Sequence, residues 1–237
     1  MNLSVKDAAA LLNVSEKTLY RWIKQGGVPA YRLHETLRFN RVELLEWATS
    51  RKIPLDPGIL SEPESGGIPL PAVSEALRNG GVLYRIEGRD KSRVLSSVVE
   101  HLRLPEEVNL NFLLKVLMAR EALGSTGIGD GIAIPHVRNP IVLHVTRPSI
   151  TLAFLEHPIE FGALDGKPVS TLFIMISPTV RAHLHLLSRL AFVLRDARVR
   201  KVLEKRETRE EIFSAIERAE AQVIAAGGRA GRAGRAR

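Results

Sequence analysis

Cysteine is absent from this chain of 237 residues. The absence excludes a disulfide framework and leaves no thiolates to serve as metal ligands. No apolar run approaches the roughly 20 residues of a membrane-spanning helix, and no basic-then-apolar leader follows Met1. Hydrophobic residues still make up 45% of the chain, which is enough for the cores of one or two domains. We therefore expect a cytoplasmic protein that makes no contact with a membrane.

Recognised metal-binding spacings are missing as well. The chain contains neither an HExxH segment nor an EF-hand loop. Nitrogen ligation by His136 together with His183 and His185 is an alternative, but these residues do not have the spacing of an established site. The sequence predicts no metal and no cofactor.

Positive charge is concentrated at the two ends of the chain. Residues 1–52 hold nine Lys and Arg against five Asp and Glu, and residues 221–237 hold four Arg and no acid. The 21 basic and 21 acidic residues between these segments cancel, so the whole formal net charge of +8 sits at the ends. A basic terminal domain is typical of proteins that bind an anionic polymer. The Gly-Arg-Ala repeat near the C-terminus predicts a disordered tail that adds either non-specific nucleic-acid affinity or solubility.

The segment 53–71 separates two parts of different character. It holds five prolines and three glycines in nineteen residues, a composition that no regular element tolerates. The predicted organisation is a domain at residues 1–52, a linker at 53–71, a second domain at 72–223 and a basic tail at 224–237.

Residues 4–24 have the pattern of two short helices joined by a tight turn. Ser4 and Ser15 are suited to N-caps, and Leu19, Trp22 and Ile23 share one face of the second helix. Such a pair is a helix-turn-helix. Residues 28–41 then alternate basic and apolar types around a turn and precede a closing helix at 42–52, an order typical of a small winged helix.

The stretch SVKDAAALLNVSEKTLYRWIKQGGVPAYRL and the later LRFNRVELLEW resemble the excisionase and MerR-like DNA-binding domains over residues 1–52. The resemblance implies that the second helix enters the major groove and that the hairpin wing touches the backbone or the minor groove. Tyr20 is a candidate for the groove or for the core. A docking module with a solvated basic face is the alternative, and the charge distribution favours DNA. Dimerisation is expected only because many helix-turn-helix proteins bind as pairs. The candidate DNA-binding residues are Lys17, Thr18, Arg21 and Lys24 on the helix and Arg32 and Arg38 in the wing.

Residues 124–139, GSTGIGDGIAIPHVRN, form a glycine-punctuated loop that leads to His136 directly after Pro135. The proline fixes φ and the glycines permit close approach of the chain, which suits an imidazole presented for chemistry. Neutral imidazole is a nucleophile, and phosphoryl transfer to it needs charge stabilisation on three equatorial oxygens. The groups expected to supply it are Arg120, the hydroxyl of Thr126, a neighbouring histidine and loop amides that include those of Gly129 and Gly131.

His183 and His185 lie at the start of a helix predicted over residues 180–194. Residues two apart on a helix point roughly 200° from each other, so at most one of these histidines faces His136. The spacing does not decide which one it is. Nor does it decide whether that histidine donates to the phosphate or fixes the tautomer of His136.

Three stretches resemble a known family: AREALGSTGIGDGIAIPH, HPIEFGALDGKPVSTLFIMISP and HLHLLSRLAFVLRD. From about Pro71 to about Val223 the chain resembles the enzyme IIA domains of the bacterial phosphotransferase system, of the mannitol, fructose and nitrogen-regulatory type. The resemblance implies an α/β domain with a mixed sheet flanked by helices. It also implies that His136 takes a phosphoryl group on its outer ring nitrogen from a histidine phosphocarrier protein, with Arg120 and His183 helping to hold the phosphate.

Val137 departs from this family, which usually has glycine directly after the active histidine. We expect the β-branched side chain to add bulk at the rim where a partner docks. The predicted function is a nitrogen-regulatory-type phosphocarrier and transcriptional regulator that couples a phosphoryl group on His136 to the binding of DNA or regulated partner proteins, without small-molecule turnover. The alternative, which Val137 favours, is a DNA-binding adaptor whose second domain is only an interaction module. A sugar-transport component is disfavoured because the chain has no membrane segment.

Composition and periodicity predict the elements of the second domain. Strands rich in β-branched residues are expected at 81–86, 148–154 and 169–176. Helices are expected from Pro105 to Arg120 and near 180–194, 197–205 and 208–222.

Overall fold

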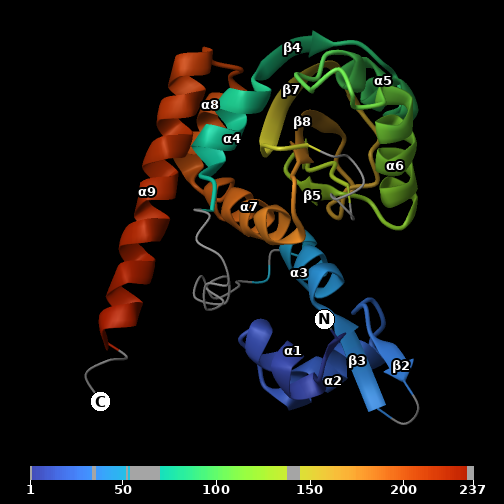
Figure 1. Cartoon of the computed structure of the whole chain (residues 1–237), viewed down its shortest axis with the longest axis vertical. Helices are drawn as coiled ribbons and strands as arrows, with labels where there is room; N and C mark the ends of the chain where they lie inside the picture. The colour runs from blue at the N-terminus through green and yellow to red at the C-terminus, as the bar shows by residue number, and fades with distance from the viewer. Residues whose placement is uncertain (1, 34–35, 52, 54–69, 138–144, 234–237) are drawn as a thin grey trace. The chain divides into compact units, whose positions relative to one another are not determined.

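The structure, a computed structural model, describes residues 2–33, 36–51, 53, 70–137 and 145–233. The chain divides into two compact units, Met1–Ile68 and Pro69–Arg237, and the division falls within the proline-rich segment (Figure 1). Within the described ranges, no helix combines the length and the apolar character needed to cross a membrane.

The first unit begins with two capped helices. In α1 (Val5–Leu11), Ser4 and Asp7 form a capping box, in which each side chain accepts a hydrogen bond from the other residue's N–H group. In α2 (Glu16–Lys24), the Ser15 hydroxyl accepts from the Thr18 N–H group. The serines therefore start both helices as the sequence predicts.

A small sheet and a third helix complete this unit. β2 (Tyr31–Leu33) and β3 (Thr36–Asn40) form an antiparallel hairpin, and β1 (Asn2–Leu3) pairs with the other edge of β3. α3 (Arg41–Ser50) follows directly. The predicted order of two helices, hairpin and closing helix is observed, whereas β1 is too short for periodicity to predict.

The second unit is a mixed five-stranded sheet with helices on both faces (Figure 1). The strand order is β4-β7-β8-β6-β5, in which β4 runs parallel to β7 and β6 parallel to β8, and the other pairs are antiparallel. A mixed sheet flanked by helices is the predicted fold class. In chain order the elements are α4 (Val73–Gly80), β4 (Val82–Ile86), α5 (Lys91–Glu100), α6 (Leu110–Ala122), β5 (Gly127–Gly129), β6 (Ile132–Ala133), β7 (Ser149–Ile159), β8 (Val169–Ile176), α7 (Val180–Val193), α8 (Ala197–Glu204) and α9 (Arg209–Ala233).

The central strand β8 is buried on both faces because its alternate side chains enter two separate hydrophobic cores. Phe173 and Met175 pack in the core formed with α4, α7, α8 and α9. Leu172, Ile174 and Ile176 pack in the core formed with α5 and α6. This two-sided burial explains why the strand is continuously apolar from Leu172 to Ile176 rather than alternating.

Two predicted boundaries differ from the structure. α6 begins at Leu110 and not at Pro105, because the Asn109 side chain caps it by accepting from the Phe112 N–H group at 2.9 Å, while residues 105–108 form a turn. α9 continues to Ala233, although the sequence predicts a disordered tail from residue 224. Alanine and arginine, which make up most of residues 224–233, are strong helix formers. Residues 234–237 lie outside the described residues.

Candidate active site around His136

His136 is carried on an extension of β6 along the central strand. β6 pairs in parallel with β8, and the pairing continues to a bridge between His136 and Met175. The Met175 N–H group donates to the Pro135 carbonyl at 3.0 Å. The His136 side chain is only 3% exposed. The sheet, and not a loose loop, therefore fixes the backbone of this histidine.

The hydrogen bonds of the imidazole define its tautomer. Nδ1 of His136 lies 2.7 Å from the Ile134 carbonyl oxygen, which can only accept, so Nδ1 carries the proton. A neutral ring has one N–H group, and the lone pair therefore sits on Nε2. Nε of Arg120 donates to this Nε2 at 3.3 Å. The outer ring nitrogen is thus the nucleophilic one, and it faces a cation.

Arg120 lies in the last turn of α6, where the helix delivers its side chain to the histidine. Its Nη1 donates to the Gly124 carbonyl at 2.9 Å, which helps to fix the guanidinium beside His136. The position beside Nε2 suits a group that binds phosphate oxygens.

The two histidines of α7 face different surroundings. The ring of His183 lies 5.1 Å from that of His136, centroid to centroid, at an interplanar angle of 51°. His185 instead interacts with Pro71, Arg189 and Glu220. Burial is the main cause that lowers the pKa of His185 to about 4. The structure therefore brings His183, and not His185, to His136.

The structure does not bring Gly129 and Gly131 to His136. Ile132, the residue after Gly131, pairs with Thr171, whereas His136 pairs with Met175 four residues further along β8. Four residues of strand correspond to roughly 13 Å. Asp130 and Gly131, with φ values of 54° and 73°, are instead the two central residues of the β5–β6 hairpin, where left-handed φ values favour Asp-Gly.

Thr126 is hydrogen-bonded to Glu121, a residue that sequence analysis missed. Its N–H group and its hydroxyl, the latter at 2.7 Å, donate to the carboxylate of Glu121, which is 5% exposed. Lys91 completes this buried cluster with its amine 2.9 Å from Glu121. The hydroxyl of Thr126 therefore anchors the turn after α6. In the sequence, the available signal was a glutamate directly after Arg120 at the end of a mostly apolar helix.

Ser177 is a second residue that sequence analysis missed. It is 1% exposed, and within the described part of the chain its hydroxyl has no hydrogen-bond partner. It is the first residue after β8, and Met175, the bridge partner of His136, lies two residues before it.

Val137 does not lie at the rim of the site as expected. Its side chain is 1% exposed and belongs to the core formed with α5 and α6. Consecutive residues of an extended segment point to opposite faces, so the residue after a histidine that faces α7 must face the other core. The expectation that Val137 impedes a docking partner was therefore wrong.

The predicted DNA-binding side chains differ in exposure. Lys17, Arg21 and Lys24 on α2 are exposed, and Tyr20 is 46% exposed and so does not belong to the core. Thr18 is half-buried and shares a hydrogen bond of 2.9 Å with the Ser15 hydroxyl. Arg38 on β3 is half-buried, and the side chain of Arg32 lies outside the described residues.

Residues 75–219, more than half of the chain, match the family "Phosphoenolpyruvate-dependent sugar phosphotransferase system, EIIA 2". The chain belongs to this family. Residues 3–52 match a helix-turn-helix domain. Both resemblances predicted from the sequence, an enzyme IIA domain of the second type and an N-terminal helix-turn-helix domain, are confirmed.

Several relatives of this enzyme IIA domain are nitrogen regulatory proteins. One from Pseudomonas aeruginosa is 36% identical over 148 residues, covering 61% of this chain and 94% of its own. Another from Escherichia coli is 34% identical over 150 residues, covering 61% of this chain and 88% of its own. The crystal structure of the nitrogen regulatory protein IIA-Ntr from Neisseria meningitidis is 33% identical, with a TM-score of 0.51 over 57% of this chain and 91% of its own.

The described residues contain no group of three or more His, Asp or Glu placed to hold a metal ion. Around His136 the structure places the guanidinium of Arg120 and the imidazole of His183.

Proposed function

We propose that His136 accepts a phosphoryl group on Nε2 from a histidine phosphocarrier protein, and that its phosphorylation state regulates the DNA-binding half of the chain. The proposal rests on two hydrogen bonds of the His136 ring, one from Nδ1 to the Ile134 carbonyl and one from Arg120 to Nε2. Together they leave Nε2 as the nucleophile beside a cation. Membership of the enzyme IIA family and the nitrogen-regulatory relatives support the proposal.

The transfer step needs no cofactor. The lone pair of Nε2 forms the new N–P bond, and the electron pair of the old N–P bond returns to the donor imidazole. The proton on Nδ1 of His136 stays on the ring and keeps its hydrogen bond to the Ile134 carbonyl throughout, so the ring loses no proton during the transfer. Arg120 binds the phosphoryl oxygens by charge-assisted hydrogen bonds, and His183 lies where it adds a further donor.

The first unit is proposed to be an excisionase or MerR-like winged helix that binds DNA. α2 would enter the major groove with the exposed side chains of Lys17, Arg21 and Lys24, and the β2–β3 hairpin would act as the wing. The family match over residues 3–52 and the net positive charge of residues 1–52 support this assignment.

α7 offers a physical connection between the phosphoryl site and the linker. His183 contacts His136 on one side of this helix, and His185 on the other side interacts with Pro71 and Glu220, where the linker enters the second unit. Glu220 also holds the start of α4 by accepting from the Val73 N–H group at 2.6 Å. A phosphoryl group of about −1.5 to −2 charges beside His183 would change the forces on the first turn of α7. We propose that this change reaches the linker through His185.

The adaptor alternative loses its support from Val137, whose side chain is in the core. The decisive experiment is incubation with phosphoenolpyruvate, enzyme I and a histidine phosphocarrier, followed by intact mass. A gain of about 80 Da, absent from His136→Ala but present in the matched variant His185→Ala, is expected. The absence of any gain with several phosphocarriers would overturn the phosphoryl assignment. The regulatory assignment would be refuted if both forms bound DNA and candidate partners equally.

A further inference from the structure

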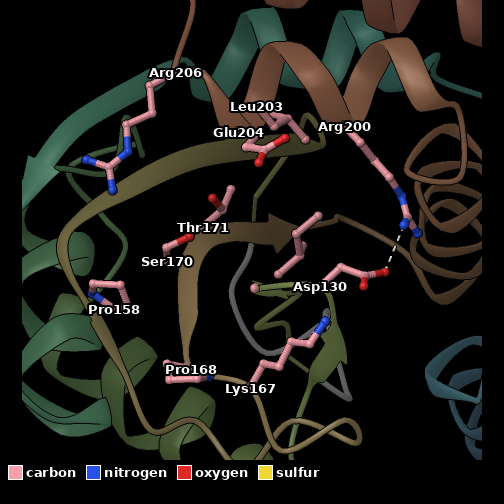
Figure 2. Close-up of a pocket in the computed structure, with 12 residues that line it drawn as sticks. Asp130, Pro158, Lys167, Pro168, Ser170, Thr171, Arg200, Leu203, Glu204 and Arg206 are labelled. Carbon is pink, nitrogen blue, oxygen red and sulfur yellow. Dashed lines mark ion pairs between the residues drawn. The ribbon is translucent and has the colours of Figure 1, made fainter.

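A groove of about 690 Å³ lies between the β5–β6 turn, the start of β8 and α8 (Figure 2). It is separate from the phosphoryl site, because its lining residue Thr171 precedes Met175, the bridge partner of His136, by four residues along β8. Among the charged and polar side chains that line it are Asp130, Lys167, Ser170, Arg200, Glu204 and Arg206.

The groove carries an excess of positive charge. Lys167, Arg200 and Arg206 stand against two carboxylates. Arg200 is paired with Asp130 at 2.8 Å, as the dashed line of Figure 2 marks. Nη2 of Arg206 donates to the Leu155 carbonyl at 2.8 Å, which orients its guanidinium and leaves other donors of the fork for a ligand.

Arg206 occupies a position where arginine is conformationally unfavourable. It is the second residue after Glu204, the last residue of α8, and it has a φ of 52°. Helices commonly end on glycine at this left-handed position, because glycine has no Cβ to clash. Glycine would end α8 without strain, so the arginine is not needed for the turn. What it adds is an oriented cation at the groove.

We propose that this groove binds a small phosphate monoester that also carries hydroxyl groups. The guanidinium of Arg206 suits the phosphate, and the amine of Lys167 on the opposite side of the groove (Figure 2) adds positive charge. The hydroxyl groups of Ser170 and Thr171 offer neutral hydrogen bonds, and the carboxylate of Glu204 accepts from ligand hydroxyls. An inorganic anion alone would leave that carboxylate with unfavourable repulsion, which is why a hydroxylated ligand fits better.

The test is titration of the full chain with fructose 1-phosphate and glycerol 3-phosphate, followed by calorimetry. Arg206→Gly keeps the backbone conformation and removes the cation, so the dissociation constant should rise about tenfold or more. Asp130→Asn keeps a residue that tolerates positive φ and releases Arg200 from its ion pair, so the affinity should increase several-fold. These two variants predict changes of opposite sign, which a loss of folding cannot imitate.

Two controls locate the binding. Arg198→Gln changes an exposed arginine of α8 that is paired with Asp196 away from the groove, and it should leave the affinity unchanged. Arg120→Gln removes the cation at His136 and should also leave it unchanged, which separates this groove from the proposed phosphoryl site. The proposal is overturned by no saturable binding at millimolar ligand, by equal affinity in all variants, or by fructose or inorganic phosphate binding as tightly as fructose 1-phosphate.

Discussion

Replacing Arg120 by glutamine should slow phosphoryl transfer strongly while lowering the stability of the fold only slightly. The side chain makes a hydrogen bond of 2.9 Å to the Gly124 carbonyl and one of 3.3 Å to Nε2 of His136. Losing the first should cost about 1 kcal/mol of unfolding free energy, a typical net value for one hydrogen bond. Losing a preorganised cation where charge develops should cost about 3–4 kcal/mol in the transition state, or about 10²–10³-fold in rate.

The assay is rapid-quench transfer from a phosphorylated carrier in excess, with thermal unfolding measured on the same samples. Arg120→Lys keeps the charge but loses the planar fork, so its rate should fall between those of wild type and Arg120→Gln. Arg218→Gln, an exposed change on α9, is the matched control. If Arg120→Gln transferred within about threefold of wild type, the assignment of this arginine to the phosphoryl group would be wrong.

Three further predictions concern buried groups. Glu121→Ala should lower the unfolding free energy by about 3–5 kcal/mol in chemical denaturation, because it leaves Lys91 and two donors of Thr126 without their carboxylate. Val137→Gly should lower it by about 2–3 kcal/mol yet leave phosphoryl acceptance within a few-fold, since the side chain is in the core; a faster acceptance would revive the rim hypothesis. Burial lowers the pKa of His185 to about 4, so between about pH 6.5 and pH 4 the folded state binds fewer protons than the unfolded state. The free energy of unfolding should therefore decrease by roughly 2–3 kcal/mol as the pH falls from about 6.5 towards 4. His185→Gln should flatten that slope.

Local patterns in the sequence were sufficient where one kind of interaction decides the structure. The serine caps of α1 and α2 and the apolar strand β8 follow from side-chain chemistry and periodicity that act over a few residues. The start of α6 was misplaced because Pro105 and Asn109 both offer plausible starts, and only the capping geometry of Asn109 decides between them.

Which residues lie near His136 depends on contacts between distant parts of the chain, and residue spacing in the sequence does not reveal these contacts. The glycines before His136 led to the prediction that their amides bind phosphate. The pairing of β6 with β8, however, places Gly131 too far along the strand to reach the histidine. The choice between His183 and His185 required the orientation of α7 over the sheet. The buried position of Val137 follows from the alternation of an extended strand, but that strand could be assigned only once the pairing with β8 was known.

The hydrogen bond from the Met175 amide to the Pro135 carbonyl allows the local stability of the site to be measured by hydrogen exchange. This amide exchanges with solvent only when the segment carrying His136 separates from β8, so its exchange rate measures the free energy of that local opening. Because Met175 is 1% exposed and central in the sheet, slow exchange would mean that the segment carrying His136 stays attached to the most stable part of the fold. Any mobility that the proposed phosphoryl transfer needs would then lie outside this segment.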